Sequence, residues 1–226
     1  MNRLIVESSE AICLVAGGAV PARDMALARR HAPVVVAADG GADRALALGV
    51  EPVAVIGDLD SLSDSARLRL AQRLHEVPEQ ETTDFDKVLR HVAAPFVLAL
   101  GVAGGRVDHA LSVLAGLLRH QATRPDMPCV ILGPQDVIFA APPVLHMTVS
   151  VGDRVSLFPM VPVTGRSQGL EWPIDGLTLA PDGRIGTSNR ASARRVVIES
   201  DRPGLLVILP RRRLAVALAA LMAIPA

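Results

Sequence analysis

Up to residue 132 the chain alternates short apolar runs with segments of helical periodicity, and this alternation limits its fold more than any other feature. The run Val34–Ala38 contains no polar residue, which is typical of a strand buried on both faces of a parallel sheet. Strands that alternate with helices at this spacing indicate βαβ units. The sequence therefore predicts an N-terminal α/β/α domain in which helices cover both faces of a parallel sheet. Strands are expected at 11–16, 34–38, 52–56, 96–100 and 129–132, and helices at about 22–31, 42–48, 63–75, from 82 onward and 108–120.

After residue 143 the pattern changes to short runs of alternating apolar residues, with no predicted helix before the C-terminal tail. One run spans 149–157 around a Gly-Asp turn, and another at 196–198 is expected to pair with 205–209 across a Pro-Gly turn. We therefore predict two domains, an α/β domain at residues 1–143 and an all-β sandwich at residues 144–226.

Composition excludes several classes of protein. Lys+Arg and Asp+Glu balance at 23 each and aromatic residues are only 2%, which argues against a nucleic-acid-binding groove. Cys13 and Cys129 lie in apolar runs, so we expect no disulfide framework and a cytoplasmic location. The apolar tail Leu214–Ala226 is too short to span a bilayer. We expect it to pack on the body of the protein or on a second subunit, and we expect no membrane partner.

Acidic and glycine-rich motifs follow the predicted strands. Asp39-Gly40-Gly41 follows the second strand, Gly57-Asp58-Leu59-Asp60-Ser61 follows the third, and Gly104-Gly105-Arg106-Val107-Asp108-His109 follows the fourth. Thr83-Asp84 begins the helix between the last two. Ligands of open parallel sheets bind beyond the carboxyl ends of the strands. These four motifs are therefore expected to meet at one ligand-binding edge.

The residue types in these motifs suit a metal ion that carries polyphosphate. In an extended backbone Asp58 and Asp60 would point to the same side, where they can share one Mg²⁺. Glycines let backbone N–H groups approach anionic oxygens, and Arg106 can bind a phosphate with two parallel hydrogen bonds. The sequence therefore predicts a magnesium-polyphosphate site.

Each motif also has a purely structural interpretation. Asp39 can occupy a left-handed turn, and Asp58 and Asp60 can form a turn that caps the helix predicted from residue 63. Asp84 and Asp108 can cap helices, and Arg106 can pair with one of them. His109 is expected to orient a neighbour or to be a satisfied histidine instead of a general base.

Motifs of three other enzyme classes are not supported by the sequence. The sequence contains neither a P-loop pattern nor a Gly-x-Gly-x-x-Gly fingerprint. Gly165-Arg166-Ser167-Gln168-Gly169 matches the nucleophile elbow of hydrolases, but no helix is predicted after it. We therefore do not expect Ser167 to be catalytic.

The motifs, in their order, resemble the signatures of thiamine pyrophosphokinases (thiamine diphosphokinases). The similarity includes Gly169-Leu170-Glu171-Trp172-Pro173 and Gly186-Thr187-Ser188-Asn189 in the second half of the chain. Leu59 and Val107 stand where that family usually has an aromatic residue, and Glu81 stands where it often has an aspartate.

This resemblance implies a fold, a reaction and an assembly. The fold would be an α/β nucleotide-binding domain followed by a β-sandwich. The reaction would convert ATP, as co-substrate, and thiamine into AMP and thiamine diphosphate with Mg²⁺. The assembly would be a homodimer that binds thiamine near the subunit boundary.

The resemblance and the motifs together assign candidate residues to four roles. The catalytic candidates are Asp58, Asp60, Asp84, Arg106 and Asp108, with Asp84 positioning or deprotonating the thiamine hydroxyl. The metal candidates are Asp39, Asp58, Asp60, Asp84 and Asp108. The nucleotide-binding candidates are Asp39, Gly40, Gly41, Gly57, Ser61, Gly104, Gly105, Arg106 and His109. The thiamine-binding candidates are Gln80, Trp172, Ser188 and Asn189, although Trp172 is equally compatible with a core position and Ser188-Asn189 with a simple turn.

Two alternatives remain from the sequence alone. One is a diphosphokinase for another heterocyclic alcohol such as a hydroxymethylpterin, which would share the α/β half. The other is a non-catalytic regulator that binds Mg-ATP as a signal.

Overall fold

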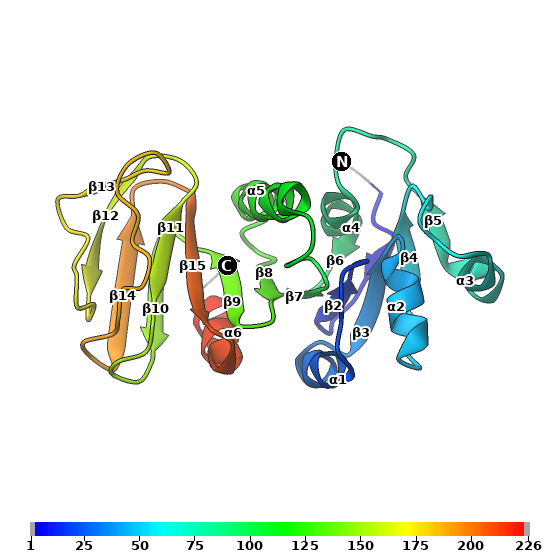
Figure 1. The fold of residues 1–226 in the computed structure, drawn as a ribbon, viewed down its shortest axis with the longest axis horizontal. Coiled ribbons are helices and arrows are strands. Elements are labelled where there is room, and N and C mark those ends of the chain that lie inside the picture. The colour runs from blue at the N-terminus through cyan, green and yellow to red at the C-terminus, as the bar shows by residue number, and fades with distance from the viewer. Residues whose placement is uncertain (1–2, 224–226) are drawn as a thin grey trace. The chain divides into compact units, whose positions relative to one another are not determined.

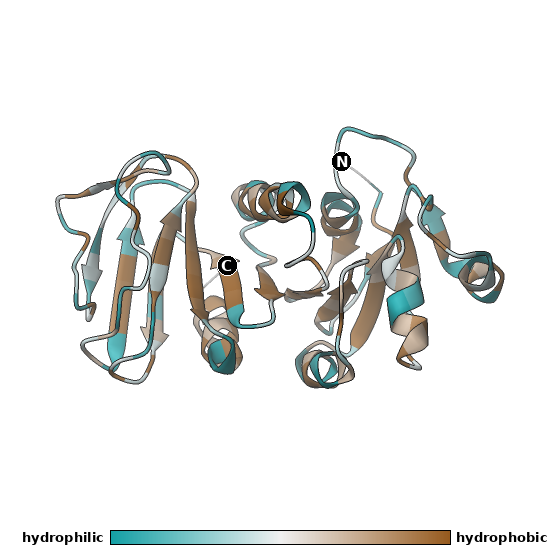
Figure 2. Cartoon of the chain, viewed as in Figure 1, coloured by the Kyte–Doolittle hydropathy of each residue, from teal (hydrophilic) through white to brown (hydrophobic). Residues whose placement is uncertain are grey.

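The computed structural model describes residues 3–223 of the chain. The chain forms two compact units that divide between Gly116 and Leu117, within helix α5 (Val107–Thr123; Figure 1). Hydrophobic residues are concentrated in the strands of both units (Figure 2).

A parallel sheet forms the centre of the first unit. Its strand order is β7-β2-β3-β4-β5, and every neighbouring pair in that order is parallel. Most residues of these strands are buried, as expected when a parallel sheet is covered on both faces. Parallel pairing is observed for the predicted strands at 11–16, 34–38, 52–56 and 96–100, and β5 joins them from a segment that was predicted to be helical. The strands are β2 (Ile12–Val15), β3 (Val34–Ala38), β4 (Ala54–Gly57), β5 (Leu74–Glu76) and β7 (Val97–Leu100).

Helices pack against this sheet from several points of the chain. Helix α1 (Ala22–His31) contacts β7, α2 (Gly41–Ala47) contacts β2 and β3, and α4 (Asp84–His91) contacts β3 and β4. Helix α4 begins sharply because Thr83 and Asp86 form a capping box. A short parallel pair, β1 (Val6–Glu7) with β6 (Val92–Ala93), joins the N-terminal segment to the end of α4.

The helix predicted at 63–75 is wrong in its extent. Helix α3 covers only Asp64–Arg69 and is followed by a 3-10 turn, η1 (Ala71–Arg73), and then by β5. Leu70 leaves the helical conformation, and Leu74 pairs with Val55 of β4. Pairing with the edge of the sheet therefore replaces the last helical turns, and Leu68 of α3 is 83% exposed.

The second unit contains two antiparallel sheets. The first has the order β11-β15-β9-β8 and the second β10-β14-β12-β13. The strands of the first sheet are β8 (Cys129–Leu132), β9 (Asp136–Ala140), β11 (Ser156–Pro159) and β15 (Leu205–Pro210). The strands of the second are β10 (Val144–Thr148), β12 (Val163–Gln168), β13 (Thr178–Leu179) and β14 (Arg195–Ser200).

The predicted pairing of 196–198 with 205–209 is wrong, because β14 and β15 belong to different sheets. Asp201 follows β14, donates its N–H to the Thr164 carbonyl and accepts from the Thr164 N–H through its side chain. The Pro-Gly segment after it therefore carries the chain from one sheet to the other and does not close a hairpin.

The apolar C-terminal tail forms helix α6 (Leu214–Met222) after a 3-10 turn, η2 (Arg211–Arg213). The helix contacts β8, β9, β10 and β15, which confirms that it packs on the body of the protein. The tail was predicted to reach Ala226, and residues 224–226 lie outside the described residues. Among residues 3–223 no helix has the length and apolarity needed to cross a membrane.

The fold is therefore α/β with mixed sheets. The boundary between residues 143 and 144, the three-layer arrangement of the first domain and the sandwich arrangement of the second remain predictions.

Candidate active site

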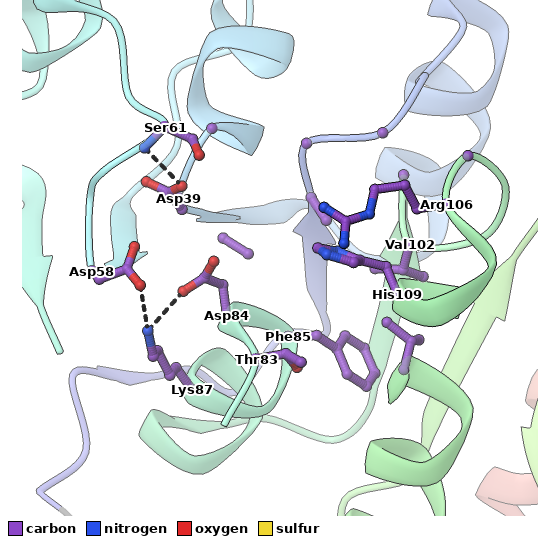
Figure 3. A pocket seen from close by; sticks show the side chains of 18 of the residues that line it. Asp39, Asp58, Ser61, Thr83, Asp84, Phe85, Lys87, Val102, Arg106 and His109 are labelled. Carbon is purple, nitrogen blue, oxygen red and sulfur yellow. Dashed lines mark hydrogen bonds and ion pairs between the residues drawn. The ribbon is translucent and has the colours of Figure 1, made fainter. Parts of the chain in front are cut away.

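A cavity of about 450 Å³ opens at the carboxyl ends of the parallel strands in the first unit (Figure 3). Residues that follow β2, β3, β4 and β7 line it together with the start of α4. Strand β2 lies between β3 and β7, so the strand order reverses at β2. Ligands of open α/β sheets bind at such a switch point. The cavity thus lies at the edge where the sequence placed its motifs.

Glycines let the loops after β2 and β7 touch at this switch point. The Gly18 N–H donates to the Gly101 carbonyl over 3.0 Å. A Cβ on Gly18 would lie only 2.3 Å from that oxygen, and Gly101 has a positive φ of 70°. Glycine is therefore required at both positions for this close approach.

Three carboxylates gather beside the cavity, two of which, Asp39 and Asp58, line it, whereas Asp60 does not. Asp39, Asp58 and Asp60 each offer an oxygen within 4.8 Å of the other two. Asp39 is 4% exposed and left-handed, with φ 44°, and its Oδ2 accepts the Ser61 N–H over 3.2 Å (Figure 3). Its Oδ1 is buried without a hydrogen-bond partner among the described residues. A buried carboxylate oxygen with no donor suits a cation, and carboxylate oxygens are the ligands that Mg²⁺ prefers.

The sequence predicts an extended backbone between Asp58 and Asp60, and this prediction is wrong. Leu59 has φ 65°, in the left-handed region. Its side chain is 6% exposed and packs in a cluster with Val55, Leu62 and Leu70. Asp58 and Asp60 therefore approach each other across a tight turn.

Lys87 belongs to the candidate site although the sequence did not single it out. Its ammonium donates to Asp58 Oδ2 and to Asp84 Oδ1, each over 3.1 Å, while its side chain is only 1% exposed (Figure 3). A signal was present, because Lys87 is the only lysine among the 23 Lys and Arg residues. It also stands three residues after Asp84 on α4, the spacing at which helical side chains meet.

These contacts set the charges of the site. Burial would raise the pKa of Asp58, but hydrogen bonds from Lys87 and Gln80 outweigh it and hold that pKa below its ordinary value. Burial would lower the pKa of Lys87, but hydrogen bonds to Asp58 and Asp84 raise it instead. Burial raises the pKa of Asp39, against the hydrogen bonds from Gly40 and Ser61. Asp58 and Lys87 therefore form a charged pair at neutral pH.

Two further predicted residues contact this cluster. Gln80, which the resemblance placed beside thiamine, donates from Nε2 to Asp58 Oδ2 over 3.0 Å. A Cβ on Gly57 would lie 2.9 Å from the Asp39 Cβ and 3.1 Å from Asp84 Oδ1, so glycine leaves room for both aspartates.

Arg106 lies across the cavity from Asp39 (Figure 3) and pairs with Asp108, which does not line the cavity. Arg106 Nε lies 3.1 Å from Asp108 Oδ1, and the Arg106 hydrogen bond lowers the pKa of Asp108 to about 2. The two side chains are 72% and 63% exposed. Within the described part of the chain Asp108 does not join the cluster of Asp39, Asp58 and Asp60. Arg106 thus pairs with a neighbouring aspartate, as the structural interpretation of this motif allows, and its binding to phosphate remains a prediction.

Most nucleotide-binding candidates line the cavity, but two lie behind it. Gly41 starts α2, where a Cβ would lie 2.0 Å from the Val15 carbonyl, and Gly57 ends β4. Both glycines therefore serve close packing. The candidates that line the cavity are Asp39, Gly40, Ser61, Gly104, Gly105, Arg106 and His109, joined by Asp58, Gln80, Asp84 and Lys87.

In the second unit, the backbone of Trp172 is held by two hydrogen bonds to the side chain of the buried residue Asn189. Asn189 is 3% exposed, accepts the Trp172 N–H through Oδ1 over 3.2 Å and donates from Nδ2 to the Trp172 carbonyl over 2.7 Å. Trp172 is 52% exposed, so it is not a core residue, and the Arg190 guanidinium lies 5.4 Å from its ring centroid. Ser188, with φ 61°, donates its N–H to Ser156 Oγ. The side chain of Asn189 therefore fixes the backbone of Trp172. A hydrogen bond from Asn189 to thiamine remains a prediction.

The Gly-x-Ser-x-Gly segment is a strand. Ser167 lies within β12, is 8% exposed, and its Oγ accepts the Ile174 N–H over 3.0 Å. The strand-turn-helix context of a nucleophile elbow is absent at this described segment, as we expected.

Fold and cavity together define a class of protein. It is an α/β protein whose acidic, glycine-lined cavity suits a cation and an anionic ligand at the carboxyl edge of a parallel sheet.

Comparison with known proteins narrows this class. The family profile "Thiamin pyrophosphokinase, catalytic domain" matches residues 26–131, and "Thiamin pyrophosphokinase, vitamin B1 binding domain" matches residues 144–205. The chain is 28% identical over 206 residues to thiamine pyrophosphokinase 1 of Arabidopsis thaliana, with 76% of each chain covered. Its fold is similar to that of thiamin pyrophosphokinase from Candida albicans, with a TM-score of 0.75 at 16% identity over 88% of this chain and 90% of that one. The fold is also similar to that of thiamine pyrophosphokinase from Bacillus subtilis, with a TM-score of 0.70 at 21% identity over 89% of this chain and 98% of that one.

The chain belongs to the thiamin pyrophosphokinase family, and it is an enzyme. The resemblance inferred from the motifs is confirmed.

Proposed function

We propose that this enzyme transfers the pyrophosphoryl group of ATP to the hydroxyl of thiamine with the help of Mg²⁺, giving AMP and thiamine diphosphate. The observation that carries the proposal is the cluster of Asp39, Asp58 and Asp60 beside glycine loops at the switch point of the sheet. Family membership supports thiamine as the acceptor, since the vitamin B1 binding profile matches residues 144–205. The same match disfavours a pterin substrate.

The three clustered carboxylates would hold the metal ion, with the unpartnered Asp39 Oδ1 as one ligand. When bound, Mg²⁺ would neutralise charge on the phosphate oxygens, which is the largest help that phosphoryl-transfer enzymes provide. Lys87 holds Asp58 Oδ2, so Asp58 keeps its other oxygen for the metal ion.

The remaining residues of the cavity position the reacting groups. The thiamine hydroxyl attacks the β-phosphorus in line, the bond to the bridging α-phosphate oxygen breaks, and AMP leaves. Arg106 is exposed and would exchange Asp108 for a phosphate. Asp84 has one oxygen on Lys87, and the other would orient the hydroxyl or accept its proton. Asp108 is then left to act in the shell around the metal ion.

Thiamine binding is assigned to Gln80 and to the second unit. Trp172 has an exposed indole ring that can stack on the cationic thiazolium. The Arg190 guanidinium lies over this ring, so it must move away from the ring or occupy the opposite face when the thiazolium binds. Homodimeric assembly with thiamine near the subunit boundary completes the proposal, and its test is the mass of the protein in solution by light scattering.

The substitution Asp58→Asn tests the metal assignment. An amide cannot supply the anionic ligand, so we expect turnover to fall at least about a thousandfold, while circular dichroism stays unchanged. Asp182→Asn, an exposed aspartate that does not line the cavity, is the matched control and should retain full activity. Thiamine diphosphate formation should also stop with EDTA and return with Mg²⁺. Normal turnover by Asp58→Asn would refute the metal assignment.

A further inference from the structure

The loop between Asp58 and Asp60 adopts a backbone conformation that its sequence disfavours. Leu59 has φ 65°, and an L-residue other than glycine pays a steric penalty there because its Cβ approaches the following carbonyl oxygen. Non-glycine residues keep such a conformation only when their surroundings enforce it. The loop that carries two candidate metal ligands therefore needs external support.

Two contacts supply that support. The Leu59 side chain is anchored in the cluster with Val55, Leu62 and Leu70, which fixes the residue but leaves the peptide plane after it undetermined. Arg67 of α3 fixes that plane, because its Nη2 donates to the Leu59 carbonyl. Helix α3 begins only a few residues after the loop, with Ser63 as its N-cap, so Arg67 lies on a short, rigid element.

The peptide held by Arg67 leads directly into the acidic cluster. The nitrogen of that peptide belongs to Asp60, and its N–H faces Asp58 Oδ1 over 3.4 Å. The next N–H, of Ser61, donates to Asp39 Oδ2 over 3.2 Å (Figure 3). Rotation of the Leu59 carbonyl would turn the Asp60 N–H away from Asp58 Oδ1, because both groups belong to one peptide plane. The Ser61 N–H follows in the next peptide, so its bond to Asp39 depends on the same loop conformation.

We propose that Arg67 is a positioning residue of the metal site, which holds the Leu59 carbonyl and thereby keeps the loop in the left-handed turn that brings Asp58 and Asp60 within 4.8 Å of Asp39. The inference rests on the proposed function of these aspartates. Arg67 touches neither metal ion nor substrate, and it acts only through the backbone.

The test uses full-length protein and Mn²⁺ alone, which binds oxygen ligands as Mg²⁺ does and is detected by electron paramagnetic resonance. Arg67→Ala should bind Mn²⁺ roughly tenfold more weakly, the loss expected for one hydrogen bond to a charged group. Arg67→Lys keeps a donor and should recover most of the affinity. Arg69→Ala is the matched control, since Arg69 lies on the same helix but pairs with Glu51.

Hydrogen exchange provides a readout without metal. The amides of Asp60 and Ser61 should exchange about tenfold faster in Arg67→Ala, while amides in β2 and β7 keep their wild-type rates. Unchanged Mn²⁺ affinity and unchanged loop exchange in Arg67→Ala would overturn the role of Arg67 alone. Wild-type protein that binds no Mn²⁺ would overturn the metal site as well. If Arg67→Ala does not fold, Arg67→Met, which keeps an unbranched side chain without a donor, replaces it: weakened Mn²⁺ binding and faster loop exchange support the proposal, and unchanged values overturn it.

Discussion

Lys87→Met should destabilise the protein and make its stability depend on Mg²⁺. Lys87 is 1% exposed and lies between Asp58 and Asp84, whose side chains are 15% and 32% exposed. Methionine keeps the unbranched apolar part of the side chain but leaves two carboxylates without their cation. Removing one partner of a buried ion pair costs about 3–5 kcal/mol, and the partial exposure of both aspartates favours the lower end.

A loss of about 3 kcal/mol corresponds to a fall in Tm of roughly 6–12 °C for a chain of this size. Mg²⁺ would bring positive charge back to Asp58, so added Mg²⁺ should raise the Tm of Lys87→Met by several degrees more than that of the wild type. Differential scanning calorimetry with EDTA and with Mg²⁺ measures both effects. Arg90→Met, on the exposed side of α4, is the control for losing a positive charge. A Lys87→Met protein with wild-type Tm, or with the same response to Mg²⁺, would refute this reasoning.

Two other predictions follow from the second unit. Asp153 is 3% exposed, and burial would raise the pKa of its carboxyl group. Hydrogen bonds from Arg213, the Ser150 N–H and Arg212 outweigh burial and lower that pKa. The ionised Asp153 therefore stabilises the fold above about pH 4, and this stabilisation is lost as the pH falls through the lowered pKa. Asp153→Asn should therefore lower the Tm at pH 7 by several degrees and by progressively less as the pH falls below about 4, and a difference that stays constant with pH would contradict the ion-pair account. Trp172 is the only tryptophan in a chain without tyrosine, so intrinsic fluorescence reports on that residue alone and should change saturably with thiamine. A flat titration would remove Trp172 from the thiamine site.

The local features of the fold could be predicted from the sequence. Helix α1 has the predicted bounds, 22–31, because its periodic segment lies between a proline and an apolar run. The meeting of Asp39 and Asp58 at one cavity could also be predicted, because the carboxyl ends of parallel strands share an edge.

Features that depend on distant parts of the chain were missed. The end of α3 and the assignment of β14 and β15 to different sheets depend on strand pairing between distant segments, which periodicity does not encode.

The site itself was half predicted. Carboxylates that directly follow predicted strands indicate a metal site, so the acidic residues could be predicted. Lys87 lies within a predicted helix, and that pattern alone does not indicate a role in the site. Its burial follows from the packing of α4 on β3 and β4, since the neighbouring residues Phe85, Val88 and Leu89 are also buried. A single lysine in an arginine-rich chain is a signal that a compact ammonium is needed where a planar guanidinium would not fit.

The central claim is that this cavity supports pyrophosphoryl transfer from ATP to thiamine. The most direct measurement incubates the purified protein with Mg-ATP and thiamine and quantifies all products by chromatography. The account predicts thiamine diphosphate and AMP in equal amounts, because attack at the β-phosphorus releases AMP. Thiamine monophosphate with ADP would contradict attack at the β-phosphorus, and the absence of any phosphorylated thiamine would contradict the proposed function as a whole.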